Sequence, residues 1–390
     1  MTSNRPSGDG FPVPGGANTL GHRMYIIKRR QTMSFHEILI AVMAAFAGLG
    51  ALDRIFGNRL GVGREFEEGI LAMGSLGLAM VGIVCLAPVL AAMLKPLVVP
   101  LFSALGADPA MFAGTILACD MGGGNLAREL TQDPQAAALG GILTGSMLGA
   151  TVVFTIPVAL GILEPRDRPA LAKGVLCGIV TIPIGVLAGG LTAGFSLTMV
   201  CRNLVPILLI AGAIALGLWR AEGAMVQGFA VFGKGVVAVV TLGLGAAIAE
   251  SLTGFALIPG MAPISDGFQT VGAIAAVLAG AFPLVAVATK LLRKPLMALG
   301  KRLGINEPAA AGLIASLANS IATFGLVRDM DDRGKIVNIA FAVSAAFVFG
   351  DHLGFTAGFA PEMIGPMIVG KLAGGVSAVA VALWLTREKE

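Results

Sequence analysis

The sequence predicts an all-α polytopic membrane protein, and three observations support this fold class. Hydrophobic residues make up 56% of the 390 residues and charged residues only 13%, whereas a soluble domain carries about 25% charged residues on a surface that faces water. Several apolar runs reach the length of about 20 residues that crosses a bilayer as a helix. The chain also contains 55 glycines, which are frequent where membrane helices pack closely.

Eleven apolar runs follow one another along the chain, at 36–57, 69–94, 109–127, 136–163, 170–197, 203–218, 223–249, 268–289, 305–327, 336–360 and 363–384. We therefore predict about eleven transmembrane helices, within a range of nine to twelve. The runs 109–127 and 203–218 are short for a full crossing. Re-entrant or broken helices are the alternative for these two.

Residues 1–33 differ from the rest of the chain, because they are rich in glycine, proline, serine and basic residues. They lack the apolar core of a signal peptide. We predict a disordered basic tail, with a true start at Met33 as the alternative. Residues 34–388 are predicted to form a single integral membrane transport domain. The tail and the basic loop 290–302 are both expected on the cytoplasmic side, where lysine and arginine concentrate.

Short strings recur at an offset close to 199 residues, which indicates an internal duplication. The matches are Lys-Pro-Leu at 95–97 and 294–296, GADPAMFAG at 106–114 with GINEPAAAG at 304–312, and the lysines Lys173 and Lys371. They divide the domain into repeat-like halves at about 69–197 and 268–386. Two similar halves around a central site are a frequent transporter design. The alternative is chance similarity between helices rich in glycine and alanine.

Asp120 is the one charged residue in the run 109–127 before Arg128, and Gly122, Gly123 and Gly124 follow it closely. An ionisable group at membrane depth is costly, so it usually faces a cavity or a partner. Consecutive glycines weaken a helix, and unwound backbone is tolerated at this depth only where protein or water covers it. We therefore predict a substrate-binding carboxylate beside a helix break. The alternative is an interfacial aspartate paired with Arg128.

Two further polar pairs interrupt apolar runs in the second half. Asn319 and Ser320 lie near the position that corresponds to Asp120, and their alternative role is hydrogen bonding between helices. Asp351 and His352 are adjacent, and an acid beside an imidazole can bind a cation or relay protons. A salt-bridged pair near the membrane surface is the alternative for these two. We predict all four as substrate-binding residues.

Glu67 and Glu68 open the second apolar run. Two adjacent acids can form an acidic vestibule for a cation, so we include both among the predicted substrate-binding residues. The alternative is structural, since the macrodipole of a helix favours acids in its first turn.

Several classes of function are disfavoured by what the chain lacks. The net charge of +4 comes from basic residues in short loops, which does not indicate nucleic-acid binding. The 4 cysteines and 3 histidines show no metal-binding spacing, so no metal or cofactor is expected. No phosphate-binding loop indicates ATP hydrolysis. An intramembrane aspartyl protease remains an alternative because two acids lie in apolar runs, although the GxGD form is missing.

Long strings of the chain resemble one known family. They are FEEGILAMGSLGLAMVGIVCLAPVL (66–90), GADPAMFAGTILACDMGG (106–123), FTIPVALGILEPRDR (154–168), GIVTIPIGVLAGGL (178–191), KPLMALGKRLGINEPAAAGLIASLANSI (294–321), MDDRGKIVNIAFAVSAAFVFGDHLGFTAG (330–358) and PMIVGKLAGG (366–375). These strings are similar to the EutH-type ethanolamine transporter, and the resemblance covers about 36–386.

The resemblance implies a multi-pass permease of the bacterial inner membrane that imports ethanolamine for a cobalamin-dependent lyase. We expect a secondary carrier or facilitator that takes the protonated amine. Transport of another small amine or polar solute is the alternative. The expected partners are ethanolamine and the lipid bilayer, and homo-oligomer formation is left open.

Overall fold

The computed structural model describes residues 34–387, apart from the side chains of residues 222, 226, 292, 293, 296, 299 and 301. The predicted tail 1–33 and the last residue of the predicted domain, residue 388, lie outside the described residues. Within the described range every regular element is helical and no strand occurs. This confirms the predicted all-α class.

The elements are α2 (Phe35–Ile55), α3 (Val62–Ala104), α4 (Ala110–Ile116), η1 (Cys119–Gly123), α5 (Gly124–Leu130), α6 (Pro134–Ala138), η2 (Leu139–Gly149), η3 (Thr151–Thr155), α7 (Ile156–Ile162), η4 (Pro165–Asp167), α8 (Arg168–Ile179), α9 (Ile182–Thr192), α10 (Leu197–Arg220), α11 (Glu222–Thr253), α12 (Ile264–Leu303), α13 (Glu307–Ala318), α14 (Ser320–Leu326), η5 (Val327–Asp329), α15 (Asp332–Ala345), α16 (Asp351–Phe359), η6 (Pro361–Met363) and α17 (Ile364–Leu385). Of these, η1, η2 and η3 are π-helical and η4, η5 and η6 are 3₁₀-helical.

Eight helical stretches of residues 34–387 are long and apolar enough to cross a membrane. They are Phe35–Ile55, Val62–Ala104, Pro134–Ile162, Pro165–Thr192, Leu197–Arg220, Gly223–Thr253, Ile264–Leu291 and Pro361–Leu385. The other three predicted runs, 109–127, 305–327 and 336–360, are each divided into shorter helices. The total of eleven crossings therefore stays a prediction. The run 203–218 is not broken, because its apolar sequence continues into the single helix α10.

Close approach of glycines holds several helices together. A Cβ added at Gly185 of α9 would lie 2.7 Å from the carbonyl oxygen of Gly370 in α17, and one added at Gly370 would lie 2.8 Å from that of Gly185. Gly82 of α3 lies against the backbone of α11 in the same way. Such contacts replace the hydrophobic effect as the source of packing between helices in lipid. They explain much of the high glycine content.

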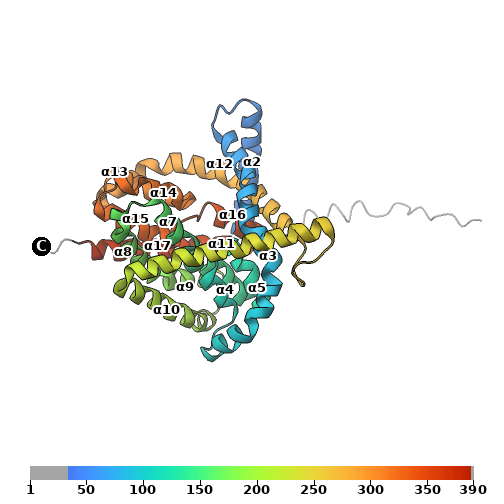
Figure 1. The fold of residues 1–390 in the computed structure, drawn as a ribbon. Coiled ribbons are helices and arrows are strands. Elements are labelled where there is room, and N and C mark those ends of the chain that lie inside the picture. Colours follow the sequence, from blue (N-terminus) through green and yellow to red (C-terminus); the bar gives the residue numbers. More distant parts are fainter. Residues whose placement is uncertain (1–33, 388–390) are drawn as a thin grey trace, which may run out of the picture.

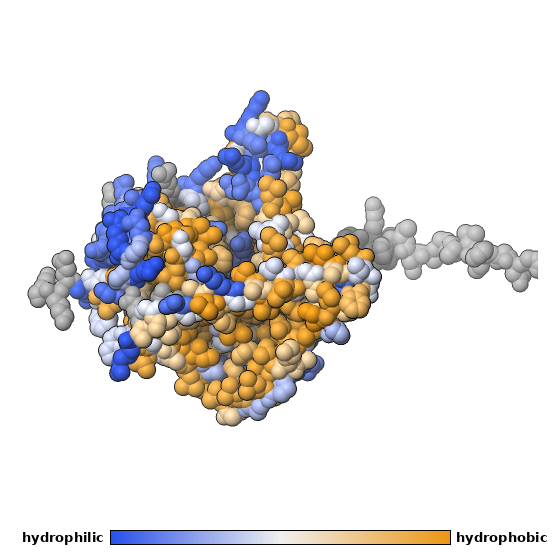
Figure 2. Space-filling view, in the orientation of Figure 1, coloured by the Kyte–Doolittle hydropathy of each residue, from blue (hydrophilic) through white to orange (hydrophobic). Residues whose placement is uncertain are grey.

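The outer surface of the bundle is largely apolar. In Figure 1, α11 crosses the front of the molecule, while α2 and α3 stand together at one side. Figure 2 shows apolar residues over and below α11, and polar residues at the tip where α2 meets α3 and at the left end. Exposed side chains on α10 and α11 include Leu208, Leu209, Val237 and Leu242. An apolar surface of this extent is typical of lipid contact, so the chain is a multi-pass membrane protein.

The segments 69–197 and 268–386 contain their helices in a similar order. Each includes a long helix with interior prolines, α3 or α12. Each continues with a broken helix, α4 with η1 and α5 in the first segment and α13 with α14 in the second. Each ends with a helix rich in glycine, α9 or α17. The duplication itself stays a prediction, because element order alone does not test it.

Candidate substrate site

The first helix break lies between α4 and η1. Leu117 and Ala118 have extended backbone, with φ/ψ of −126°/141° and −64°/150°. The helix resumes at Cys119, and the carbonyl of Ala118 accepts hydrogen bonds from the backbone amides of Met121 and Gly123 at 3.0 and 2.9 Å. Asp120 therefore lies in the first turn after the break, where the helix dipole favours negative charge.

Gly122 is the glycine of the triplet that the backbone conformation requires. Its φ of +89° is in the region that other residues rarely adopt. A Cβ at this position would also overlap the side chain of Ile83 in α3. Gly123 and Gly124 have ordinary helical backbone, but a Cβ at Gly124 would lie 2.7 Å from the ring of Phe355. The predicted helix-breaking role therefore belongs to Gly122, whereas its two neighbours allow close packing.

Two further breaks hydrogen-bond to each other. Asn319 has extended backbone between α13 and α14 and caps α14, since its side-chain oxygen accepts a hydrogen bond from the Ile321 amide at 2.8 Å. The third break, at 346–350, separates α15 from α16. There the amide of Phe347 donates to the carbonyl of Ser316 at 3.0 Å, and that of Phe349 to Leu317 at 2.9 Å. These bonds satisfy backbone amide and carbonyl groups outside regular helix, which lipid cannot hydrogen-bond.

Phe347 has a backbone conformation that bulky residues rarely adopt, with φ of +62°. A residue in this region costs on the order of 1–3 kcal/mol and persists only where its surroundings hold it. Its ring stacks edge-on against Phe154 at 5.5 Å and lies 5.2 Å from the ring of His352. The packing of these aromatic rings, together with the bond to Ser316, holds the third break in place.

The three breaks surround one cavity of about 270 Å³. Its polar lining consists of Ser75, Asp120, Asn319, Asp351 and His352, and its apolar lining includes Phe154, Met121, Ile321 and Phe347. The polar residues come from α3, η1, the α13–α14 break and the first turn of α16. Helices that are far apart in sequence thus place their non-helical segments at the same point.

The charged groups of the cavity are close together and largely shielded. Nε2 of His352 lies 3.6 Å from Oδ1 of Asp120, and the two side chains are 4% and 13% exposed. Nδ1 of His352 has no hydrogen-bond partner among the described residues. Arg128, the alternative partner for Asp120, instead donates to the carbonyl of Phe359 at 2.8 Å and lies over the ring of that residue. Asp120 therefore lies beside the ring of His352, and Arg128 is bonded elsewhere.

Lys371, in the middle of α17, adds a positive charge behind the cavity. Its side chain is 1% exposed, and its Nζ donates a hydrogen bond to the carbonyl of Ser146 in η2 at 2.5 Å. A positive charge on Lys371 favours the carboxylate form of Asp120. In the sequence, Lys371 stands out as a match between the two repeat-like halves rather than as a site residue. A lone lysine inside the apolar run 363–384 was the available signal, by the same reasoning that selected Asp120.

Comparison with known proteins identifies the family. The family model described as "Ethanolamine utilisation protein, EutH" matches residues 35–385. The chain belongs to the EutH family. A relative from Listeria monocytogenes named "Probable ethanolamine permease EutH" is 62% identical, over 90% of this chain and 95% of its own.

Relatives of the same name from Escherichia coli and Salmonella typhimurium are 48% and 49% identical, over 92% and 90% of this chain and 97% and 96% of theirs. No solved structure shows a significant match to the chain. The EutH family and these relatives are permeases and not enzymes, which agrees with the predicted class.

Of the seven predicted substrate-binding residues, four line the cavity and three do not. Asp120, Asn319, Asp351 and His352 line the cavity. Ser320, which follows Asn319 in the chain, does not line the cavity. It is fully buried, and its hydroxyl has no hydrogen-bond partner among the described residues.

Glu67 and Glu68 do not line this cavity. They lie near the start of α3, where Glu67 forms an ion pair of 3.2 Å with Arg54. The helix begins at Val62, so both acids lie in its second turn, and the acid of its first turn is Glu65. The macrodipole favours acids mainly in the first turn, so it does not explain their position, and a vestibule stays a prediction.

One group of side chains in the cavity wall has the composition of a metal site. The donor atoms of Cys119, Asp120 and His352 lie within 4.8 Å of one another. Thiolate, carboxylate and imidazole together are ligands that zinc accepts. A positive charge on the buried Lys371, which favours the carboxylate form of Asp120, opposes a metal cation at that point.

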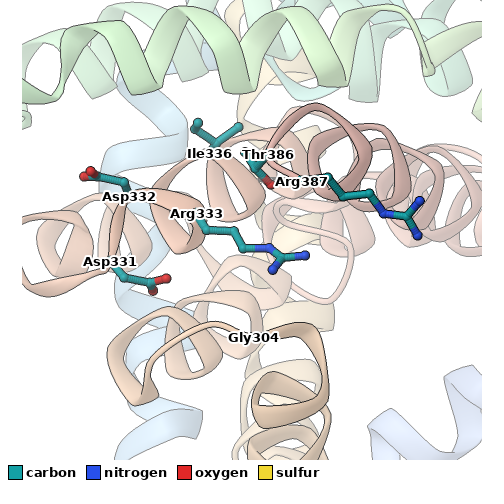
Figure 3. A pocket seen from close by; sticks show the side chains of 7 residues that line it. All are labelled: Gly304, Asp331, Asp332, Arg333, Ile336, Thr386 and Arg387. Atoms are coloured by element: carbon teal, nitrogen blue, oxygen red, sulfur yellow. The ribbon is translucent and has the colours of Figure 1, made fainter. Parts of the chain in front are cut away.

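A larger hollow of about 930 Å³ lies elsewhere, at the ends of α12, α15 and α17. In Figure 3, the side chain of Arg333 extends over Gly304, and Arg387 points away from the other labelled residues. Asp331 accepts a hydrogen bond from the Asn306 amide at 3.0 Å and thereby fixes the start of α13. None of the residues that line this hollow belongs to a helix break, so the smaller cavity is the better candidate for the substrate site.

Proposed function

We propose that this permease imports ethanolamine, as its protonated monocation, across the bacterial inner membrane. The names of the relatives support the substrate, and the membership of the EutH family supports transport. No phosphate-binding loop occurs in the sequence, so a secondary carrier or facilitator is proposed rather than an ATP-driven pump.

The observation that carries this proposal is the charge of the cavity. A primary amine titrates at about 10.4 in a lysine side chain, so ethanolamine is a cation at neutral pH. Burial of an isolated ammonium is very costly unless an anion is nearby. With Asp120, Asp351 and Lys371 ionised and His352 neutral, the formal charges of these side chains sum to −1. One ammonium ion brings this sum to zero.

The other groups of the cavity suit the rest of the molecule. The oxygen of the Asn319 side chain accepts a hydrogen bond from Ile321, and its amide NH₂ group, which has no acceptor among the described residues, can donate to the substrate hydroxyl. The rings of Phe154 and Phe347 provide an apolar wall for the two methylene groups. An ammonium over the face of a phenylalanine also gains about 0.5–1 kcal/mol or more. A volume of about 270 Å³ admits a molecule of this size together with water.

We further propose that the segments 69–197 and 268–386 move against each other during transport. The cavity lies where the broken helices of the two segments meet. Broken helices at the interface of two repeats position the substrate in several transporter folds. Rocking of one segment against the other would open the cavity to each side of the membrane in turn.

The direct test is uptake of labelled ethanolamine by proteoliposomes. The assay is done at about pH 6 with low substrate, because the neutral amine crosses lipid unaided and its fraction falls with pH. We expect saturable uptake that other small primary amines compete for and that ethylene glycol, a neutral molecule of the same shape, does not. Uptake no faster than that of protein-free liposomes would remove the proposal. Equal competition by ethylene glycol would instead favour a carrier of neutral polar solutes.

A further inference from the structure

The burial of Lys371 requires a physical explanation that substrate binding does not supply. It is the one fully buried lysine among the side chains that the structure describes. Its helix α17 lies against α9 at glycines, and η2 covers it from another side. The side chain therefore cannot reach the membrane surface, as lysines near helix ends do. A buried ammonium is stable only with a nearby anion.

Lys371 faces the candidate site from behind. The hydrogen bond to Ser146 fixes its ammonium beside η2. A Cβ added to the neighbouring Gly145 would lie 3.1 Å from the Cys119 amide, so η2 itself lies against the break that holds Asp120. A positive charge on Lys371 favours the carboxylate form of Asp120 and disfavours a protonated His352. Lys371 does not line the cavity, so the ammonium of the protein would act on Asp120 from outside the cavity and the ammonium of the substrate from within it.

A positive charge at this place opposes the binding of a cation, because like charges repel strongly in a poorly hydrated site. The same positive charge instead stabilises the carrier when no substrate is bound. Without substrate, Asp120 and Asp351 would leave two uncompensated negative charges in the protein interior. Lys371 offsets one of them.

We propose that Lys371 is the internal counter-cation of the empty carrier, which allows the site to reorient without substrate. This inference rests on the proposed function. The formal charge of the site is then −1 when empty and 0 when loaded. Replacement of Lys371 by a neutral residue changes these values to −2 and −1. The loaded site of the variant therefore has a formal charge of −1, which the empty wild-type site also has. The empty site of the variant has a formal charge of −2, which the wild-type site has in neither state.

Net uptake and exchange should therefore respond differently to the loss of the Lys371 charge. Net uptake requires the empty site to return, but exchange of internal for external ethanolamine uses the loaded site alone. We therefore expect Lys371→Met to lower net uptake by about tenfold or more, because an additional uncompensated charge at membrane depth is costly. Exchange should keep most of its rate. The KM for ethanolamine should fall, because the ammonium meets one more unopposed negative charge.

The experiment compares net uptake with exchange in proteoliposomes that contain the wild type, Lys371→Met or Lys371→Arg. Lys173→Met serves as the matched control, because Lys173 is the repeat counterpart of Lys371 but is exposed. Lys173→Met and Lys371→Arg should retain the wild-type ratio of exchange to net uptake, and Lys371→Met should raise it. If Lys371→Met does not insert, Lys371→Gln replaces it, since the glutamine amide can still donate a hydrogen bond.

Equal loss of exchange and net uptake in a variant that is inserted and monodisperse would overturn the role of Lys371. An unchanged KM for exchange would overturn it as well. Failure of the wild type to transport ethanolamine would instead refute the proposed function.

Discussion

The break before η1 and the break before α14 lie at similar places in the two repeat-like segments, but their side chains are used differently. Asp120 forms no cap for its own helix and extends to the cavity and His352. Asn319 also faces the cavity, but its oxygen caps α14 through Ile321. The first break needs the left-handed backbone of Gly122, whereas the second is formed by an extended asparagine.

The difference indicates a division of roles between the two segments. The first break provides charge, and its geometry is maintained by a glycine and the packing around it. The second break provides a fixed backbone, and its polar side chain serves structure first. A cavity built in this way binds one cationic group at one side and leaves the other side for a hydroxyl. We expect substitutions at the two breaks to separate into effects on transport and effects on stability.

The largest effect is expected for Asp120→Asn. The substitution keeps the size of the side chain but removes the negative charge, so the formal charge of the site rises from −1 to 0 and an ammonium is no longer neutralised. Uptake of labelled ethanolamine at low substrate should fall by about 100-fold or more. Melting temperature and monodispersity should stay close to those of the wild type. Uptake at the wild-type rate would mean that the first break does not provide the charge that binds the substrate.

Gly122→Ala is expected to disrupt the first break itself. An alanine in left-handed backbone costs about 1–2 kcal/mol, and its methyl group overlaps Ile83 in addition. The melting temperature measured in detergent should fall by several degrees, with loss of transport. Gly77→Ala in α3 is the control, because a Cβ at Gly77 meets nothing within 4 Å. Equal melting temperatures for both variants would show that the break tolerates ordinary backbone.

Asn319→Ala should act mainly on stability, since it removes the cap of α14. Loss of a helix cap costs about 1 kcal/mol, which should lower the melting temperature by a few degrees and reduce uptake moderately. Asn319→Asp keeps a capping oxygen and should restore the melting temperature. If Asn319→Ala abolishes transport as completely as Asp120→Asn without any loss of stability, the second break has a recognition role equal to the first.

The smallest effect is expected for Glu67→Gln, outside both breaks. Its ion pair with Arg54 is exposed, with 55% and 43% of the two side chains accessible, and exposed pairs contribute about 0–1 kcal/mol. Uptake and melting temperature should both stay within experimental error. A rise in KM of tenfold would show instead that the acids of α3 form a vestibule for the cation.

The sequence allowed the fold class and part of the site to be predicted, because some features are encoded locally. Asp120 and Gly122 stand out in an apolar run, since lipid makes an ionisable group and a weakened helix costly there. The third break could not be predicted. The positive φ at Phe347 and the bonds to Ser316 and Leu317 depend on contacts with a helix about 30 residues earlier in the chain.

The burial of Lys371 and the exposure of Lys173 also could not be read from their similar local sequences. Lys173 is followed by Gly174 and Lys371 is preceded by Gly370, and both lysines lie in apolar runs. Which of them is buried depends on packing against η2, whose sequence is remote from both. The place of Glu67 and Glu68 within α3 could not be read from the apolar run either, because α3 begins before that run.

The central claim is that a negatively charged cavity at the meeting point of three helix breaks binds a small protonated amine. Equilibrium binding of labelled ethanolamine to the purified protein in lipid nanodiscs, at about pH 6, tests this claim most directly. We predict saturable binding by the wild type that ethylene glycol does not displace, and a loss of that binding in Asp120→Asn. Equal binding by the wild type and a folded Asp120→Asn variant would contradict it.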